Sequence, residues 1–141
     1  MFEVPRLTIR PGTGGYSKGQ ARVIEILEAA LDVLLDEGYQ ALTMRRIARA
    51  CGITVGNVTY YYKTKDDLVR DLTAGVLESY LNIFSDISTD ESRSLEDRFI
   101  TIIRLLLEDI MTKKTTHFFP ELWALANHDQ FIAERVNELY I

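Results

Sequence analysis

The chain has 141 residues, of which 47% are hydrophobic and 26% charged, and its formal net charge is -5. This composition is that of a globular protein and excludes an intrinsically disordered chain. The single cysteine, Cys51, excludes an internal disulfide framework, and the apolar runs are too short to span a bilayer. No signal peptide is recognisable, so we expect a cytoplasmic protein with no membrane partner.

Residues 1–17 are predicted to form a flexible arm, because prolines and glycines interrupt any regular element. The stretch GTGGYSKGQ superficially resembles a phosphate-binding loop, but no strand precedes it and Gln20 stands where such a loop needs lysine. Arg6 and Arg10 could reach a minor groove of DNA. A solvated tail is the favoured interpretation.

Helical periodicity begins after the arm. Apolar residues at helical spacing predict a first helix over about 18–37, which Gly38 terminates. Two short helices follow, and each begins after a threonine whose side chain can cap it. These capping threonines, and the glycine between the two helices, are Thr43, Thr54 and Gly52. A capping box from Thr64 to Asp67 opens a long fourth helix that reaches about Phe84.

Three more helices are predicted after the polar segment STDESR. Ser94 caps a fifth helix, Pro120 starts or kinks a sixth, and a seventh runs from about Asp129 to the end of the sequence. No segment alternates as a strand apart from a weak run in the arm. The predicted fold class is therefore all-α. The expected divisions are an arm, a three-helix domain and a second helical domain, at residues 1–17, 18–64 and 65–141.

Charge is distributed unevenly between the two halves of the chain. Residues 1–72 carry a net charge of +1, whereas residues 73–141 carry -6. Within the first half, the segment 38–65 contains five basic residues and no acidic residue. A polyanion would therefore be attracted to the first half and repelled by the second.

The acid-free segment has the residue spacing of a helix-turn-helix unit. Ala48 is small where the two helices would cross, and Gly52 tolerates positive φ in the turn. Val58, on the second helix, can fill the space between the two helices with an apolar side chain. With these residues buried, the second helix would enter the major groove of DNA by its N-terminal end. There Asn57 can pair with adenine, and Val55 can pack on a thymine methyl group.

Other residues around the second helix are expected to contact bases or phosphates. Arg45 precedes it and could reach a guanine or a phosphate. Tyrosine hydroxyls and a lysine ammonium group lie further along, where the duplex backbone would pass. The DNA-contacting residues expected in addition to those above are Thr54, Gly56, Thr59, Tyr60, Tyr61 and Lys65.

The stretch LTMRRIARACGITVGNVTYYYKTKDDL, with flanks from about Arg22 to Leu72, resembles the TetR family of bacterial transcriptional regulators. The resemblance implies an N-terminal three-helix DNA-binding domain followed by a helical ligand-binding and dimerisation domain. Members contact operator DNA at the positions of Thr43, Arg45, Thr54, Asn57, Tyr60, Tyr61 and Lys65. Thr59 departs from the family pattern, which usually has tyrosine there, and Tyr60 and Tyr61 would take over part of that contact.

Large apolar residues are abundant in the second half of the chain. Most are expected to fill a core, and by analogy with the family a subset would line a site between helices for an apolar or aromatic effector. The candidate lining residues are Tyr80, Phe84, Phe99, Ile103, Leu107, Met111, Phe118 and Trp123. His117 and His128 lack other ligands at metal spacing, so no metal or other cofactor is expected.

These features predict that the protein is a repressor. It would bind a palindromic double-stranded operator as a homodimer, and a small apolar or aromatic effector would release it. One alternative is a DNA-binding protein of the same fold that protein partners regulate. A remote alternative is a helical enzyme with an accidental motif, but no residue spacing implies catalysis, so an enzyme is not expected.

The end of the sequence still reads as a helix, with apolar residues and no stop signal. In proteins that resemble this one, further helices follow and form the dimer interface. We therefore expect a C-terminally shortened form, the alternative being a natural short protein that dimerises through its remaining helices.

Overall fold

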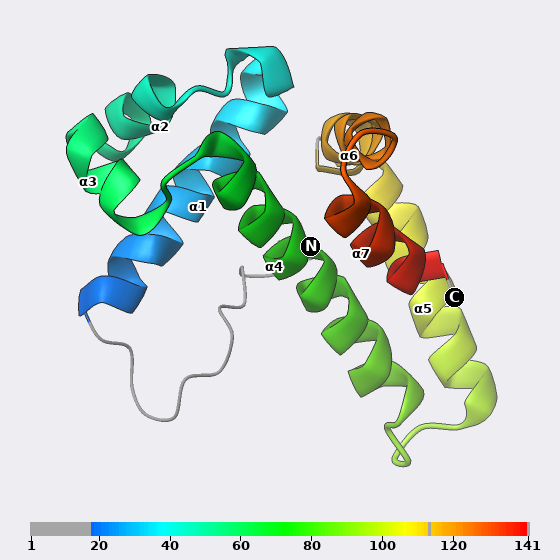
Figure 1. Ribbon diagram of the computed structural model, residues 1–141. Helices are drawn as coiled ribbons and strands as arrows, with labels where there is room; N and C mark the ends of the chain where they lie inside the picture. The colour runs from blue at the N-terminus through cyan, green and yellow to red at the C-terminus, as the bar shows by residue number, and fades with distance from the viewer. Residues whose placement is uncertain (1–17, 113, 141) are drawn as a thin grey trace.

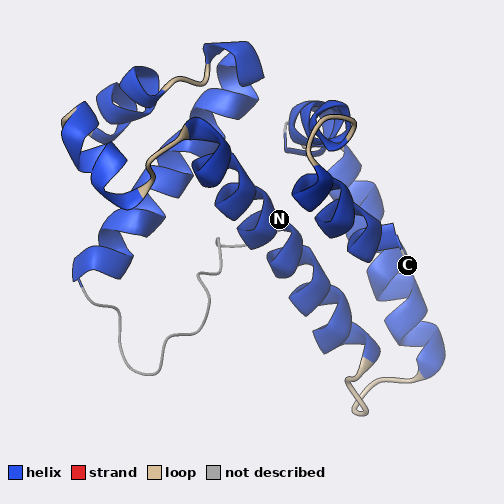
Figure 2. Cartoon of the chain, in the orientation of Figure 1, coloured by secondary structure: helices blue, strands red, loops and turns tan. Residues whose placement is uncertain are grey.

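The computed structural model describes residues 18–112 and 114–140, and all regular structure in these ranges is helical (Figures 1 and 2). The predicted all-α class is confirmed, while the expected arm lies outside the described residues. None of the described helices is both long and apolar enough to cross a membrane. In chain order the elements are α1 (Lys18–Glu37), η1 (Tyr39–Ala41), α2 (Met44–Cys51), α3 (Val55–Tyr61), α4 (Lys65–Ser88), α5 (Leu95–Ile110), η2 (Lys114–Phe118), α6 (Phe119–Ala126) and α7 (Gln130–Tyr140).

Helices α2 to α5 each begin at a hydroxyl N-cap. In all four, the side-chain oxygen of the capping residue accepts a hydrogen bond of 3.0–3.1 Å from the backbone N–H three residues later. This bond satisfies one of the N–H groups that the first turn of a helix leaves without an intrahelical acceptor. The capping residues, all predicted from the sequence, are Thr43, Thr54, Thr64 and Ser94.

Two glycines end helices by adopting positive φ, as predicted. Gly38 follows α1 with φ 84°, and Gly52 follows α2 in the left-handed helical conformation with φ 68°. From there the backbone N–H of Ile53 donates to Ala48 O at 3.0 Å, which closes the end of α2. The chain is thereby turned within three residues to the cap of α3.

Gly52→Ala is expected to lower the free energy of unfolding by about 1–2 kcal/mol, because an L side chain is strained in the left-handed region. Gly56→Ala is the matched control: Gly56 has ordinary helical φ, and an added Cβ would meet only Thr54 Oγ1, at 3.8 Å. That change should raise stability by about 0.5–1 kcal/mol through helix propensity. Urea denaturation of both variants measures the contrast, and equal effects at the two sites would contradict the assigned turn.

Helices α1, α2 and α3, which we call the head, pack around one buried cluster. The two helices of the helix-turn-helix pack against each other as predicted. Ala48 lies where they cross, and Ile47 and Val58 are fully buried. Tyr62, just after α3, is also buried, and its hydroxyl donates to the Asp71 carboxylate of α4. Burial raises the pKa of this phenol, and the bond to Asp71 raises it further. The neutral Tyr62 side chain therefore links the end of the head to α4 by a hydrogen bond.

The long helix α4 connects the head to the remaining helices (Figure 1). Its inner face is buried from the first turn to the middle of the helix, and α7 packs along it. The cores of the head and of the second half form one continuous cluster of buried side chains. The expected division between residues 64 and 65 falls at the N-cap of α4 and stays a prediction.

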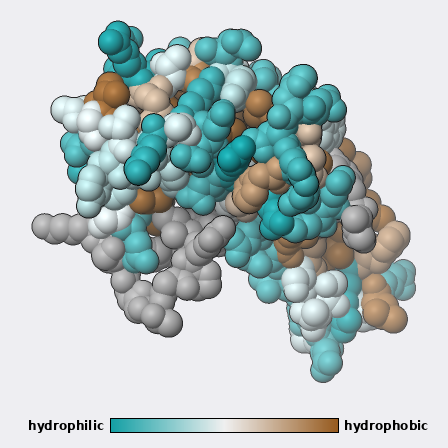
Figure 3. Space-filling model, in the orientation of Figure 1, coloured by the Kyte–Doolittle hydropathy of each residue, from teal (hydrophilic) through white to brown (hydrophobic). Residues whose placement is uncertain are grey.

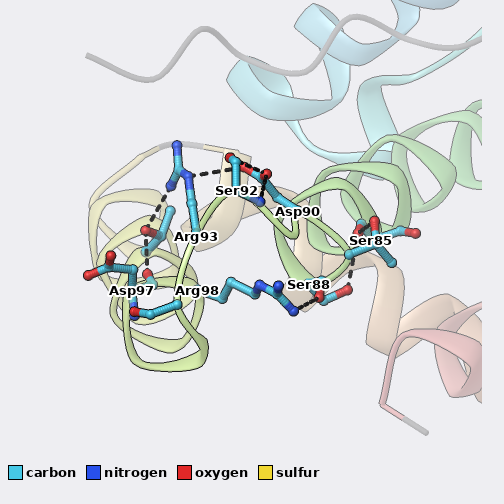
Figure 4. Close-up of polar contacts among 10 residues, drawn as sticks. Ser85, Ser88, Asp90, Ser92, Arg93, Asp97 and Arg98 are labelled. Carbon is cyan, nitrogen blue, oxygen red and sulfur yellow. Dashed lines mark hydrogen bonds and ion pairs between the residues drawn. The ribbon is translucent and has the colours of Figure 1, made fainter.

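The turn between α4 and α5 is held by side-chain contacts (Figure 4). Asp90 accepts hydrogen bonds from the hydroxyl and the backbone N–H of Ser92, and these bonds lower the pKa of its carboxyl group. Arg93 pairs with Asp90 at 3.2 Å and donates to Thr101 Oγ1 at 3.0 Å. Arg98 reaches back from α5 and donates to Ser88 O at 3.1 Å. These contacts set α5 antiparallel to the second half of α4.

Helix α5 is covered by little of the described chain. Leu105 is its one buried residue, although the helix is apolar on several faces. Over the right-hand edge of Figure 3, where α5 lies in Figure 1, hydrophobic surface is prominent, whereas the head is largely hydrophilic. The exposed apolar residues of α5 and its C-cap are Leu95, Phe99, Ile100, Ile103, Leu106, Leu107, Ile110 and Met111.

Candidate nucleic-acid interface and cavity

The outer surface of α3 carries side chains that the packing of the head turns to solvent. Thr54, Gly56 and Asn57 are exposed at its N-terminal end, and Val55 is 38% exposed beside them. Tyr60 lies one turn further on and is 81% exposed. An exposed tyrosine ring of this kind is available to a partner rather than to the core. The N-terminal end of α3 thus offers a small, uncharged surface.

Basic residues surround this surface. Thr43 and Arg45 are exposed at the start of α2, and Arg49 follows one turn later. Arg46, by contrast, pairs with Glu37 of α1 through an Nε–Oε2 contact of 2.8 Å. The charge of Arg46 is therefore partly neutralised within the head, which leaves Arg45 and Arg49 as the exposed cations of α2.

Two expected contact residues are directed toward the protein itself. The Thr59 hydroxyl donates to the backbone oxygens of Val55 and Gly56, at 3.1 and 3.0 Å. Tyr61 is half-buried against the core and meets the ring of Tyr60 edge-on, with 5.0 Å between centroids. The structure therefore separates these two from the exposed group, because the Thr59 hydroxyl is bonded within α3 and Tyr61 is packed against the core.

Lys65 occupies a position that the sequence does not predict. Its ammonium donates to Tyr39 O at 3.0 Å and lies 3.8 Å from the centroid of the Tyr39 ring. Partial burial lowers the pKa of this ammonium, while Asp66 opposes the shift. An ammonium has three N–H donors, so a phosphate contact is compatible with the bond to Tyr39. Lys65 thus joins η1 to the start of α4 at the edge of the candidate interface.

Lys65→Ala is expected to cost about 1–2 kcal/mol of stability, because it removes a hydrogen bond and a cation–π contact. It should also weaken binding to all DNA sequences and reduce the slope of log K against log salt by about 0.9. Lys63→Ala is the matched control, since Lys63 is exposed: it should leave stability within about 0.5 kcal/mol. Chemical denaturation measures the difference, and equal stability of the two variants would contradict the Tyr39 contact.

A cavity of about 680 Å³ lies between α4, α5 and α6. Three of the eight residues expected to line an effector site, Tyr80, Phe84 and Trp123, line this cavity. The remaining wall was not predicted from the sequence, and it includes polar groups as well as apolar ones. The residues that prediction missed are Leu81, Ser85, Ser88, Ile102, Leu106, Asp109, Ile110 and Phe119.

The other five candidate lining residues lie outside this cavity. Phe118 is 1% exposed and belongs to the core, where its ring packs edge-on against Phe119 at 5.6 Å. The other four lie on a different face of α5, along an open groove with polar residues at its rim. Successive helical residues are about 100° apart, so the α5 residues that line this cavity are offset by about one position from the predicted ones. The four residues are Phe99, Ile103, Leu107 and Met111.

The cavity has one well-defined polar feature. The hydroxyl of Tyr80, from α4, donates to Asp109 Oδ2, from α5, at 2.7 Å. The Tyr80 ring is fixed by Phe119 on one side and Phe84 on another, with centroid distances of 5.6 and 6.3 Å. A carboxylate and a phenol are thus held at the wall of a largely apolar space.

Within residues 18–112 and 114–140, no three His, Cys, Asp or Glu side chains come close enough to hold a metal ion. Cys51 is half-buried, and its thiol lies 3.5 Å from Glu25 O. Burial raises the pKa of this thiol, and Glu25 adds to the effect. A thiol with a raised pKa is a weak nucleophile at neutral pH, so Cys51 acts as a packing residue.

Comparison with known proteins identifies the head. The family described as "Bacterial regulatory proteins, tetR family" matches residues 26–72, which run from α1 through the helix-turn-helix to the first turns of α4. The head of this chain belongs to the TetR family. Every residue expected to contact DNA lies within the matched segment.

Relatives of known sequence and structure extend the TetR-family likeness beyond the head. The uncharacterized HTH-type transcriptional regulator in the dhlA 5' region of Xanthobacter autotrophicus is 25% identical over 87% of this chain and 62% of the relative. The transcriptional repressor KstR2 of Mycobacterium tuberculosis H37Rv is 31% identical over 51% of this chain and 36% of its own length. The crystal structure of a TetR transcription regulator from Haloarcula marismortui has a TM-score of 0.72 and 26% identity, covering 84% of this chain and 62% of that one. The chain thus spans less than two thirds of each of these relatives.

Proposed function

We propose that this TetR-family protein is a DNA-binding transcriptional regulator, most simply a repressor, that binds a palindromic operator as a homodimer in the cytoplasm. The observation that carries the proposal is the exposed N-terminal end of α3, with Thr54, Gly56 and Asn57, set in a segment free of acidic residues. A helix that enters the major groove reads bases with such residues. An acidic side chain here would face the phosphates.

The exposed residues divide into two roles under this proposal. Asn57 and Val55 read base edges, by a bidentate amide contact to adenine and by packing on a thymine methyl group. Thr43, Arg45 and Tyr60 surround them and contact the phosphate backbone, with Lys65 at the margin. Thr59 and Tyr61 contribute through the placement of α3, because their side chains are engaged within the head.

An effector is proposed to act from the cavity through α4. Tyr80 and Phe84 line the cavity on the same helix whose first residue, Lys65, lies at the edge of the interface. The second half also touches the head directly, since the His117 ring Nδ1 hydrogen-bonds to Leu35 O at 3.0 Å. Arg70 of α4 pairs with Asp129 at 2.9 Å, just before α7. A ligand that favours one placement of α4 over another would therefore change the spacing of two heads.

The direct test is selection of genomic DNA fragments that the protein retains, followed by footprinting. We expect two half-sites about 10–10.5 base pairs apart, or a multiple of this, related by two-fold symmetry. Retention of fragments without a shared sequence, or with a single unpaired half-site, would contradict the proposal. Release of the retained operator by an apolar ligand then tests the effector, with electrophoretic mobility as the readout.

A further inference from the structure

Helix α5 has one side packed against the rest of the chain and the opposite side open. Leu105 is 3% exposed, whereas Leu107, two residues further on, is 62% exposed. Successive helical residues are about 100° apart, so these two side chains point in directions about 160° apart. Around Leu107 lies the open groove that also includes Phe99, Ile103 and Met111. A continuous apolar surface with a polar rim is typical of a protein interaction site.

Apolar residues on the open side of α5 repeat with the spacing of a helix that packs against another helix. The four residues at intervals of three, four and three positions are Ile100, Ile103, Leu107 and Ile110. Each of them is at least 40% exposed. This spacing places the four side chains in one stripe along the helix, and two such stripes interlock when two helices lie side by side. The stripe therefore fits a second helix.

Two residues of opposite charge flank the stripe. Among the described residues that line the groove, Arg104 and Glu108 are the charged ones. Because they are four positions apart, they lie on the same side of the helix. The groove thus carries an arginine and a glutamate along one edge, in a fixed order along the chain.

This order of charges distinguishes two ways of pairing α5 with a second copy of itself. In a parallel pair each residue would face itself, so Arg104 would meet the same cation. In an antiparallel pair with Ile103 opposite Leu107, Arg104 of one copy and Glu108 of the other share a flank, about 3 Å apart along the helix axis. A two-fold axis makes this contact twice, since residue i meets j and j meets i. The charges therefore favour the antiparallel pair.

We propose that the α5 groove binds the α5 groove of a second copy of this chain, antiparallel and about a two-fold axis. The inference rests on the proposed homodimer and names the surface that forms it. Helix α5 lies on the side of the molecule away from α2 and α3 (Figure 1). Pairing there leaves the N-terminal end of α3 open to DNA in both copies. A two-fold axis is also the symmetry that a palindromic operator requires.

A lipid surface is the rival occupant of this apolar face. Helices that lie on lipid headgroups carry Lys and Arg beside their apolar side. Helix α5 contains four acidic residues and only two arginines. Its composition is therefore unsuited to an anionic membrane surface, whereas the alternation of Arg104 and Glu108 suits an identical helix.

Sedimentation velocity of the 141-residue chain tests the pairing. We expect a dimer with twice the chain mass of 16.2 kDa. The dissociation constant should be about 1–50 µM, because one pair of helices is a small interface. Protein diluted well below this value is monomeric, so its unfolding reports on the single chain. A parent that stays monomeric at about 100 µM would overturn the proposal, and co-sedimentation of that monomer with phosphatidylcholine vesicles would assign the face to lipid instead.

Two leucine substitutions on α5 locate the contact. Leu107→Glu places a charge at the centre of the groove and should raise the dissociation constant at least about 30-fold. Leu95→Glu is the matched control, because Leu95 is 79% exposed in the first turn of the same helix, outside the groove. It should change the dissociation constant by less than about threefold. Circular dichroism of dilute samples establishes that both variants are folded, and equal dimerisation by the two would refute the assigned surface.

Charge reversal tests the antiparallel register. Arg104→Glu alone and Glu108→Arg alone should each weaken the dimer about tenfold, because each brings like charges together at two symmetric positions. The double variant restores opposite charges across the interface and should dimerise within about threefold of the parent. If the single variants dimerised like the parent, or the double variant dimerised more weakly than either of them, the antiparallel pair would be wrong.

Operator binding by the same variants separates this inference from the proposed function. It is measured by mobility shift with a full palindrome and with a single half-site. If the chain dimerises through α5 but selects no operator, the inference stands and the regulatory function fails. If the parent binds a palindrome as a dimer and Leu107→Glu does so equally tightly, the dimer forms through another surface. In that case the proposed function stands and the inference fails.

Discussion

Asn57→Ala is expected to weaken binding to the selected operator by about 1–3 kcal/mol per half-site while leaving binding to random duplex almost unchanged. The reason is that Asn57 lies exposed at the N-terminal end of α3, where a bidentate amide contact would read one base pair. Truncation removes that contact but no charge. The variant should also tolerate substitution of the matching base pair, which the parent should not. Fluorescence anisotropy with operator and scrambled duplexes measures both effects.

The control for this variant is Asn127→Ala, which changes the same residue type at an exposed position after α6, outside the helix-turn-helix. It should bind operator and random duplex like the parent. If Asn57→Ala weakened binding to the operator and to the random duplex equally, Asn57 would be contributing to the fold or to a phosphate contact. The base-reading role would then be wrong. Denaturation curves for both variants exclude a difference in stability as the cause.

Phe118→Ala is expected to reduce the free energy of unfolding by about 3–5 kcal/mol, the largest loss of stability among the changes considered. Phe118 is 1% exposed; it is the last residue of η2 and the N-cap of α6, and its ring lies edge-on to Phe119. Its truncation leaves a cavity in the continuous core that joins the head to the second half. Urea unfolding followed by circular dichroism measures the effect.

Phe99→Ala is the matched control because it removes the same side chain from a site that is 65% exposed. It should change stability by no more than about 0.5 kcal/mol. Both phenylalanines were candidates for the effector site, so the pair also distinguishes core from surface among those residues. Comparable losses in the two variants would mean that the exposed face of α5 is covered in solution.

The boundaries of the helices follow from the sequence because the signals that set them are local. Thr43, Thr54, Thr64 and Ser94 each cap a helix through a bond to a backbone N–H three residues away. Gly52 ends α2 through its own φ. Such interactions form within one turn of chain, so no distant residue is needed to predict them. The helix-turn-helix follows for the same reason, since Ala48 and Val58 are only ten residues apart.

The tertiary structure decided the features that depend on residues far apart in the chain. Helix α5 is apolar on several faces, and only the packing against α4 and α6 selects Ile102 and Leu106 for the cavity instead of Ile103 and Leu107. The Tyr80–Asp109 pair and the Lys65–Tyr39 contact join residues separated by 29 and 26 positions. Side-chain periodicity indicates that a helix face is apolar. Which other helix packs on that face depends on how the whole helices fit together. For this reason the helices and the exposed N-terminal end of α3 were predictable, whereas the cavity wall was not.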